Sequence, residues 1–266
     1  FTLGSNVSAN VNGRDGCSWT FRKAPGFFDI QTYTGSGENG QTINHDLDAV
    51  PGMVIVKQTS TAGSWYVYHR GLGSGKHLKL NNSAEQSSDD NYEIGKTTCT
   101  STQFSIDTGS EIDASGQTYI AYFFAHDDQR FGTDEDEAII KCGSYTGNGN
   151  ATGPVIDLGF EPQFILMRYP AGANWYMYDS MRGIATGQDD NWLVPNNNEV
   201  ENTNQERLAL TASGFQITTT NGNFNGNGAE YIYMAIRRPH KPASEFAATD
   251  LFNGVLTSSD SSTTTG

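Results

Sequence analysis

The sequence predicts an all-β protein made of tandem β-sandwich repeats of a jelly-roll-like kind. Three observations support this fold class. The chain of 266 residues is rich in glycine (30 residues) and in aromatic residues, and few of its residues are charged (17%), a composition typical of strands and turns. Its apolar segments are short or alternate with polar residues, and no long segment keeps a helical periodicity. One series of motifs also occurs twice.

The internal repeat is marked by landmarks that recur in one order about 110 residues further along the chain. Each copy has a Tyr-Thr-Gly turn, an apolar segment after a proline, a strand that begins with tryptophan, and a closing aromatic strand. The paired landmarks are Tyr33 and Tyr145, Pro51 and Pro162, Trp65 and Trp175, residues 101–106 and 212–217, and residues 116–127 and 228–239. Five landmarks in one order indicate a duplicated unit.

The repeat divides the chain into five segments. Residues 28–126 and 138–240 are predicted to form one β-sandwich each. The acidic residues 127–137 are predicted to be a solvated linker that keeps the two sandwiches apart. Residues 1–27 are interpreted as the closing strands of a preceding repeat, with an independent N-terminal cap strand as the alternative. Residues 241–266 are expected to be a linker or tail, and the whole chain a piece of a longer protein.

Each copy is predicted to contain about seven short strands joined by tight turns. The segments GMVIVK (52–57) and QFILMR (163–168) are short and apolar, as expected of buried strands. The segments SWYVY (64–68) and NWYMY (174–178) alternate between two faces. TQFSI and GFQIT alternate in the same way, TYIAYFFA and EYIYMAI close the two copies, and Asn-Gly pairs supply turns.

The alternation in the two tryptophan strands separates two kinds of side chain. Trp65 shares a face with Val67, and Trp175 shares one with Met177. This apolar company predicts that the tryptophans lie in the core. The tyrosines on the opposite face are expected to be exposed or to lie at an interface.

Composition argues against several classes of partner. The net charge of −14 repels nucleic acid and anionic membranes, so we predict no nucleic-acid partner. No apolar segment is long enough to span a membrane, so we predict no membrane insertion. The three cysteines are an odd number without a Cys-x-x-Cys pair, which indicates neither a disulfide framework nor a zinc site and favours assembly in a reducing compartment.

Several motifs taken together resemble a known family. A Tyr-Thr-Gly turn (33–35) is followed by HDLDAVPGMVIVK (45–57), WYVYH (65–69) and YIAYFFA (119–125), and the second copy carries KCGSYTGNG and DLGFEPQFILM. As a set these motifs resemble a repeat domain common in tail-fibre and other virion proteins of tailed bacteriophages, especially marine ones. The resemblance covers roughly residues 1–240. It implies a virion component, with a fibre as the expected place, and it supplies no catalytic residues.

The tyrosine face is the first candidate binding site. Aromatic rings stack on sugar rings, and neighbouring Asn and Asp side chains hydrogen-bond hydroxyl groups. The predicted glycan-binding residues are Tyr66, Tyr68, Tyr176 and Tyr178. The alternative is that these tyrosines form cross-strand pairs that stabilise a sheet, or fill a subunit interface.

The acidic linker is the second candidate site. Its carboxylates are ligands of the type that Ca²⁺ prefers, but their spacing does not match an EF-hand loop. The candidate ligands are Asp127, Asp128, Asp134 and Asp136, with a solvated linker as the alternative; no other cofactor is expected. His69 at the end of a strand is interpreted as a hydrogen-bonded structural residue, because no Ser-His-Asp or Cys-His order emerges.

These observations favour a non-catalytic structural module of a bacteriophage fibre, attached to tail or capsid, that projects towards host-surface glycans. The expected localisation is the virion, after assembly in the host cytoplasm. The expected partners are other copies of the chain, in a homo-oligomer such as a trimer, other virion proteins, and host-surface polysaccharide. A polysaccharide-degrading tailspike or accessory carbohydrate-binding module, whose paired carboxylates the sequence cannot place, is one alternative. A bacterial surface adhesin is the other.

Overall fold

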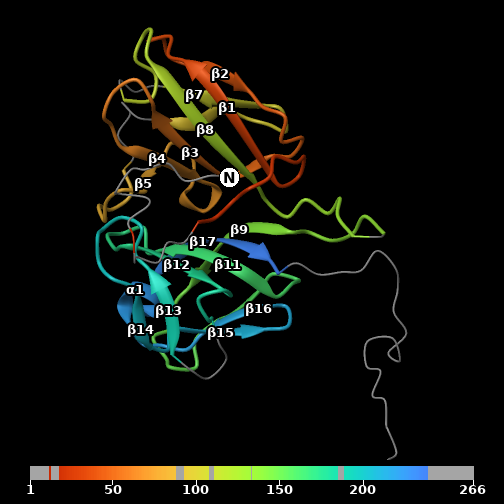
Figure 1. The fold of residues 1–266 in the computed structure, drawn as a ribbon, viewed down its shortest axis with the longest axis vertical. Coiled ribbons are helices and arrows are strands. Elements are labelled where there is room, and N and C mark those ends of the chain that lie inside the picture. The colour runs from red at the N-terminus through yellow and green to blue at the C-terminus, as the bar shows by residue number, and fades with distance from the viewer. Residues whose placement is uncertain are drawn as a thin grey trace, which may run out of the picture.

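The computed structural model describes residue 12 and residues 18–87, 93–107, 111–132, 134–184 and 189–238. The strands form two bodies, which Figure 1 shows one above the other. We call residues 28–125 the N-terminal module and residues 140–237 the C-terminal module. In the described residues every pairing between named strands is antiparallel.

The N-terminal module consists of two sheets and a short 3₁₀ helix, η1. The larger sheet has the strand order β1-β8-β3-β4-β5 and the smaller one β2-β7-β6. The elements are β1 (Phe28–Thr34), β2 (Gln41–Asn44), β3 (Pro51–Gln58), β4 (Trp65–His69), η1 (Arg70–Leu72), β5 (Leu78–Lys79), β6 (Ile94–Cys99), β7 (Gln103–Ile106) and β8 (Thr118–Ala125).

The C-terminal module has the corresponding strands in the corresponding order. Its larger sheet runs β14-β13-β12-β11-β17-β9 and its smaller one β10-β16-β15, so that β9, β17, β11, β12 and β13 take the places of β1, β8, β3, β4 and β5. The elements are β9 (Ile140–Thr146), β10 (Val155–Asp157), β11 (Pro162–Arg168), β12 (Trp175–Asp179), β13 (Asp190–Leu193), β14 (Asn202–Gln205), β15 (Leu208–Thr211), β16 (Gly214–Ile217), α1 (Gly222–Asn225) and β17 (Glu230–Arg237). The predicted all-β, sandwich-type fold is confirmed.

The two modules also share an irregularity of the main chain. In each, the pairing of the central strand with the closing strand shifts register directly after the proline, at Pro51 in β3 and at Pro162 in β11. Proline has no N–H to donate to a ladder, so a bulge is a place where a sheet tolerates it. The residues three positions earlier, Asp48 and Gly159, both have a positive φ, of 52° and 75°.

The Tyr-Thr-Gly turn has a clear structural role. The Tyr33 ring stacks on that of Tyr119 with centroids 4.9 Å apart, and its hydroxyl donates to the backbone carbonyl of Ile112. The glycine of the motif, Gly35, lies so close to the next turn that an added Cβ would be 2.2 Å from the carbonyl oxygen of Ala114. The motif therefore fixes β1 to its neighbour β8, the strand that closes the module.

The C-terminal module has the same arrangement between β9 and β17. Tyr145 stacks on Tyr231 with centroids 4.9 Å apart, and a Cβ on Gly147 would lie 2.3 Å from the carbonyl oxygen of Gly226. A buried side chain fixes the turn in each case. Asp113 accepts the amide of Ser36 in the N-terminal module, and Asn225 accepts the amide of Asn148 in the C-terminal one.

The predicted faces of the tryptophan strands are reversed in the structure. Tyr66 and Tyr178 are fully buried and point into the interior of their sandwiches, where Phe104 and Phe215 of the smaller sheets also lie. Trp65 and Trp175 lie on the outer faces of the larger sheets. Trp175 is nevertheless buried, as predicted, in the cluster that joins the modules, whereas Trp65 is half-buried. Their apolar neighbours misled the prediction because much of each outer face is also buried: Val67 is fully buried although it does not face its own sandwich interior.

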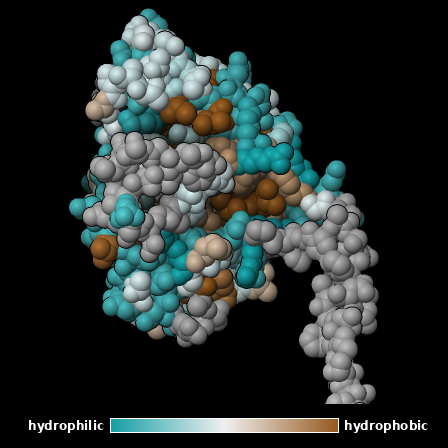
Figure 2. Space-filling view, in the orientation of Figure 1, coloured by the Kyte–Doolittle hydropathy of each residue, from teal (hydrophilic) through white to brown (hydrophobic). Residues whose placement is uncertain are grey.

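The two modules are in direct contact, so the prediction that the acidic linker keeps them apart is wrong. A single buried cluster joins the N-terminal core to Phe164, Leu166, Trp175, Ile232, Met234 and Ile236 on the outer face of the C-terminal sheet. Figure 2 shows apolar atoms at the level where the modules meet. The linker is fixed at one side of this contact, where Arg130 pairs with Asp48 at 2.8 Å and Arg237 with Glu137 at 2.7 Å.

Candidate functional site

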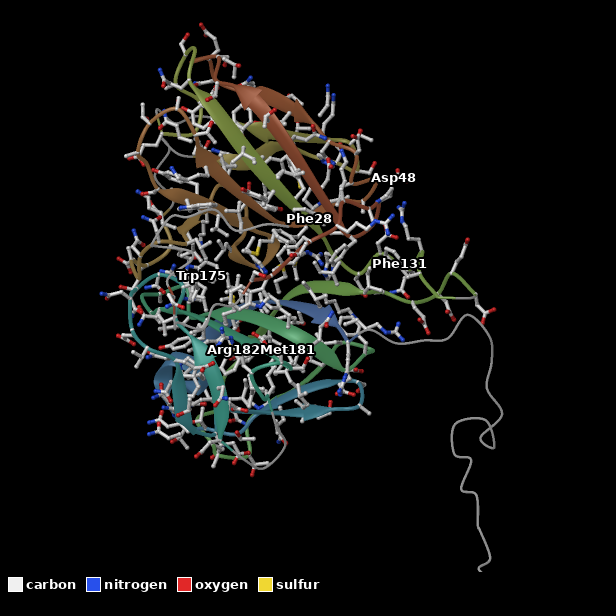
Figure 3. The ribbon with its side chains drawn as sticks, viewed as in Figure 1. Phe28, Asp48, Phe131, Trp175, Met181 and Arg182 are labelled. Carbon is white, nitrogen blue, oxygen red and sulfur yellow. The ribbon has the colours of Figure 1, made fainter. Side chains whose placement is uncertain are left out.

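The contact between the modules is the most elaborate site in the described residues, and we call it the joint. Its centre is a pair of cross-strand neighbours, Arg168 on β11 and Trp175 on β12. The Arg168 Cζ lies 5.1 Å from the centroid of the Trp175 ring, within the range of a cation–π contact. Both side chains are 1% exposed. Figure 3 shows Trp175 at the level of the junction between the modules.

Arg168 and Trp175 bind the main chain of residues 79–84 in the N-terminal module, which comprise the end of β5 and the loop that follows it. Arg168 Nη1 donates to the carbonyls of Lys79 and Asn82 at 2.9 and 3.1 Å, and Nη2 donates to the carbonyl of Ala84. The Trp175 indole N–H donates to the Lys79 carbonyl as well, at 2.9 Å. Residues 79–84 are therefore held by four hydrogen bonds from two side chains of the other module.

The buried guanidinium has backbone carbonyls as its partners in the joint. Burial lowers the pKa of Arg168 to about 10, so the group is still charged at neutral pH. A planar guanidinium offers five N–H donors in a fixed arrangement, which suits several carbonyls that converge from one loop. A buried charge of this kind is tolerated only while its hydrogen-bond partners stay in place, which makes the joint sensitive to any separation of the modules.

His69 forms a second contact across the joint. Its Nδ1 accepts the amide N–H of Gly71 at 3.0 Å, which caps η1, so the ring proton is on Nε2. Nε2 lies 3.0 Å from the carbonyl oxygen of Tyr233 in the C-terminal module and donates to it. Burial lowers the pKa of His69 to about 4 and keeps the ring neutral. The interpretation of His69 as a hydrogen-bonded strand-end residue is confirmed.

Cys142 on β9 forms the third contact. A Cβ on Gly52 would lie 2.7 Å from the Cβ of Cys142, so the glycine is needed for this close approach. The thiol donates to the carbonyl of Ala125 at 3.5 Å. Burial raises the pKa of Cys142 well above its usual value, so the group is a neutral packing element and a poor nucleophile.

A cleft of about 240 Å³ lies at the edge of the joint. Its walls are mostly apolar and come from the segment before β1 and from the C-terminal sheet; they include Trp19, Phe21, Phe164, Met181 and Ile236. Arg182 stacks over the Trp19 ring at 5.5 Å and pairs with Asp179. Figure 3 shows Met181 and Arg182 on this part of the lower module.

The predicted glycan-binding tyrosines do not form an exposed platform. Tyr66 and Tyr178 are fully buried, and Tyr176 is 7% exposed beneath Phe224. Tyr68 is half-buried and packs edge-on against Phe104 with centroids 5.2 Å apart. The expectation of a sugar-stacking surface at these four positions is therefore wrong, because the residues fill the interior of the sandwiches.

The predicted calcium ligands are not brought together either. Asp127 pairs with Lys141 at 3.2 Å and Asp128 with Arg130 at 2.7 Å, so both carboxylates already have cationic partners. Asp134 and Asp136 are exposed further along the linker. Across the parts of the chain that the structure describes, no three His, Cys, Asp or Glu side chains are grouped as metal ligands.

The sequence contained one signal for the joint that our prediction did not use. QFILMR places an arginine at the end of an otherwise apolar buried strand, where the first copy has Lys57. A charge at the end of a buried strand is expected to reach solvent, so the sequence pattern alone does not distinguish Arg168 from Lys57. The acceptors are main-chain carbonyls about 85 residues earlier in the chain, and main-chain groups leave no mark in a sequence.

These features define a class: an all-β protein of two similar sandwich modules fixed to each other by a buried joint. The chain belongs to the family described as "Domain of unknown function (DUF7483)", whose model matches residues 2–239. One family model thus spans both modules. No curated protein and no solved structure matches the chain. Among the helices of the described residues, none is long and apolar enough to cross a membrane.

Proposed function

We propose that the chain is a non-catalytic structural module of a bacteriophage fibre, in which two copies of one β-sandwich unit are fixed in series. The assignment to a virion is drawn from the resemblance of the motifs to fibre and virion repeat domains. The matching strand orders of the modules support the view that one unit was duplicated. Attachment to tail or capsid, and a trimeric state, stay predictions.

The joint is the observation that carries this proposal. A fibre that projects from a particle needs successive units that do not swing freely, and a flexible linker would not provide this. Here the contact combines an apolar cluster with hydrogen bonds from Arg168, Trp175 and His69 to the main chain of the other module. Main-chain acceptors have fixed positions within a sheet or turn, so these bonds define one relative orientation.

The chemistry of the joint also fits a structural role. Its titratable groups are held in forms that do not react: the His69 ring is neutral and has both nitrogens occupied, and the Cys142 thiol is buried. The carboxylate of Asp179 at the edge of the joint is paired with Arg182. A glycosidase site would need two carboxyl groups about 5–10 Å apart around an open groove.

Two measurements test the proposal. Immuno-electron microscopy of particles that carry the parent protein, with an antibody raised against residues 18–238, is expected to label a fibre. Incubation of the purified chain with polysaccharide from the host envelope is expected to release no reducing ends. Label confined to the particle interior, or turnover of the polysaccharide, would contradict the proposal. Glycan binding is a separate prediction in which the buried tyrosines take no part, and a glycan array tests it.

A further inference from the structure

The N-terminal module carries a counterpart of the Arg168–Trp175 pair. Lys57 and Trp65 are cross-strand neighbours on β3 and β4, at the same register position as Arg168 and Trp175 on β11 and β12. The Lys57 Nζ lies 6.0 Å from the Trp65 ring centroid. The modules share a further contact: the backbone N–H of each tryptophan donates to the side-chain oxygen of an asparagine. Trp65 donates to Asn81 at 2.9 Å, and Trp175 donates to Asn196 at 2.8 Å.

The two pairs differ in what covers them. Arg168 and Trp175 are buried under the loop of the other module, whereas Lys57 and Trp65 are only half-buried. Within the described residues, the Trp65 indole N–H has no hydrogen-bond acceptor, although the equivalent group of Trp175 does. The surrounding outer face of the sheet is apolar and half-buried at Ile30, Ile120 and Tyr122. We call this surface, with Lys57 and Trp65, the N-terminal face.

The loop that covers the Arg168–Trp175 pair has a counterpart as well. Leu78 pairs with Val67 and Leu193 pairs with Met177, which aligns HLKLNN (77–82) with WLVPNN (192–197). The acceptors Lys79, Asn82 and Ala84 therefore correspond to Val194, Asn197 and Glu199. We call residues 194–199 the C-terminal loop. Its Asn197 and Glu199 are exposed, and the adjoining Val200 is 89% exposed.

We propose that a second copy of this chain docks its C-terminal loop on the N-terminal face, with contacts like those that residues 79–84 make to Arg168 and Trp175. The rest of the outer face, at Met53 and Val67, is already buried within the chain and takes no part. The internal joint is the template, because it shows how such a loop and such a face fit. Charge supports the pairing: Glu199 takes the place of Ala84, whose carbonyl meets the Arg168 guanidinium, so its carboxylate would lie beside Lys57. Each chain has a net charge of −14, so non-specific contacts between copies are repulsive.

The contact joins two different surfaces, so it does not close on itself. Each copy keeps one unused loop and one unused face after docking, and addition continues head to tail. Lysine offers a single ammonium where arginine offers a planar fork with five donors, so the contact between copies is weaker than the internal joint. The expected result is reversible, concentration-dependent growth. This inference goes beyond the proposed function, since a fibre module can also be continued by covalent linkage alone.

Charge-reversal variants of the whole chain test the proposal by sedimentation velocity over a range of concentrations. Lys57→Glu places two carboxylates at the contact, and Glu199→Lys places two ammonium groups there. Each variant alone is expected to associate at least about tenfold more weakly than the wild type. An equimolar mixture is expected to assemble again, because every contact between unlike copies then joins opposite charges. The control Asp134→Lys, on the exposed linker, is expected to assemble as the wild type does.

The outcomes that overturn the proposal are equally definite. A wild-type chain that stays monomeric at every concentration, growth that stops at a dimer, or a mixture that assembles no better than its components would each exclude head-to-tail docking. Trp65→Phe removes the indole N–H and keeps the ring, and unchanged association of this variant counts against the proposal too. All variants change half-buried or exposed side chains, and urea unfolding checks that they are folded. A failure of the chain to associate in this way would not contradict the fibre assignment, which the immuno-electron microscopy of particles tests separately.

Discussion

Arg168 and Trp175, neighbours on adjacent strands of the C-terminal module, donate to the same carbonyl oxygen, that of Lys79 in the N-terminal module. This shared acceptor ties the orientation of the two modules to the positions of two side chains. It also makes the joint testable, because the equivalent pair in the N-terminal module offers a matched control at each position.

Arg168→Met is expected to lower the free energy of unfolding by about 3 kcal/mol, because it removes the buried donor to the carbonyls of Asn82 and Ala84 and one of the two donors to that of Lys79. Urea unfolding followed by tryptophan fluorescence measures the change. The matched variant Lys57→Met lies at the half-buried equivalent position and is expected to change the stability by less than about 1 kcal/mol. If the two substitutions lowered the free energy of unfolding equally, the hydrogen bonds of Arg168 across the joint would add no stability of their own.

Trp175→Phe separates the hydrogen bond of the indole from its packing. The variant retains an aromatic ring against Arg168 but loses the N–H donor to Lys79, and a loss of about 1–2 kcal/mol is expected. In a double-mutant cycle with Arg168→Met, the two losses are expected not to add, because both residues serve one acceptor. Strict additivity would mean that the two hydrogen bonds form independently.

The joint is expected to loosen in acid because of His69. Its folded pKa of about 4 is below the ordinary value of 6.5, so the unfolded chain takes up a proton that the folded chain excludes. Stability therefore falls as the pH drops from about 6.5 towards 4, by up to about 3 kcal/mol. Protonation of Nδ1 would also remove the acceptor for the Gly71 amide.

The measurement for His69 is the pH dependence of urea unfolding between these values. His69→Gln is expected to be less stable than the wild type at pH 7 and to have a flatter pH profile. His126, whose pKa burial also lowers to about 4, and Arg70 lie near His69, so His126→Gln is the control for a contribution from the neighbouring ring. An unchanged profile in the His69 variant would assign the acid sensitivity elsewhere.

Gly35→Ala and Gly147→Ala are expected to destabilise their modules by more than about 2 kcal/mol each, because the added Cβ would collide with a main-chain carbonyl at 2.2 or 2.3 Å. Gly222→Ala is the control, since a Cβ there meets nothing within 4 Å and the residue lies in a helix. Thermal unfolding monitored by circular dichroism gives the comparison. A Gly35 variant as stable as the Gly222 variant would rule out the role of the Tyr-Thr-Gly turn.

The fold class was predictable because strands and turns have local sequence patterns. Alternation, apolar segments after proline and Asn-Gly turns reflect main-chain preferences that hold wherever the segment lies, so residues such as Pro51 and Pro162 marked the strands correctly. The tyrosine face of the tryptophan strands was assigned wrongly for a related reason. A period of two says that Tyr66 and Trp65 point to opposite sides, but not which side is the interior.

The sequence by itself therefore determined the strands, their alternation and the correspondence between the two series of motifs. Only the tertiary structure decided which face of each sheet is buried, that the modules contact each other, and that Arg168 meets the carbonyls of Lys79, Asn82 and Ala84. The physical reason is that strand formation depends on neighbours along the chain. Burial of an outer face and satisfaction of a buried guanidinium depend on main-chain groups from another module, whose positions exist only once both sandwiches have folded.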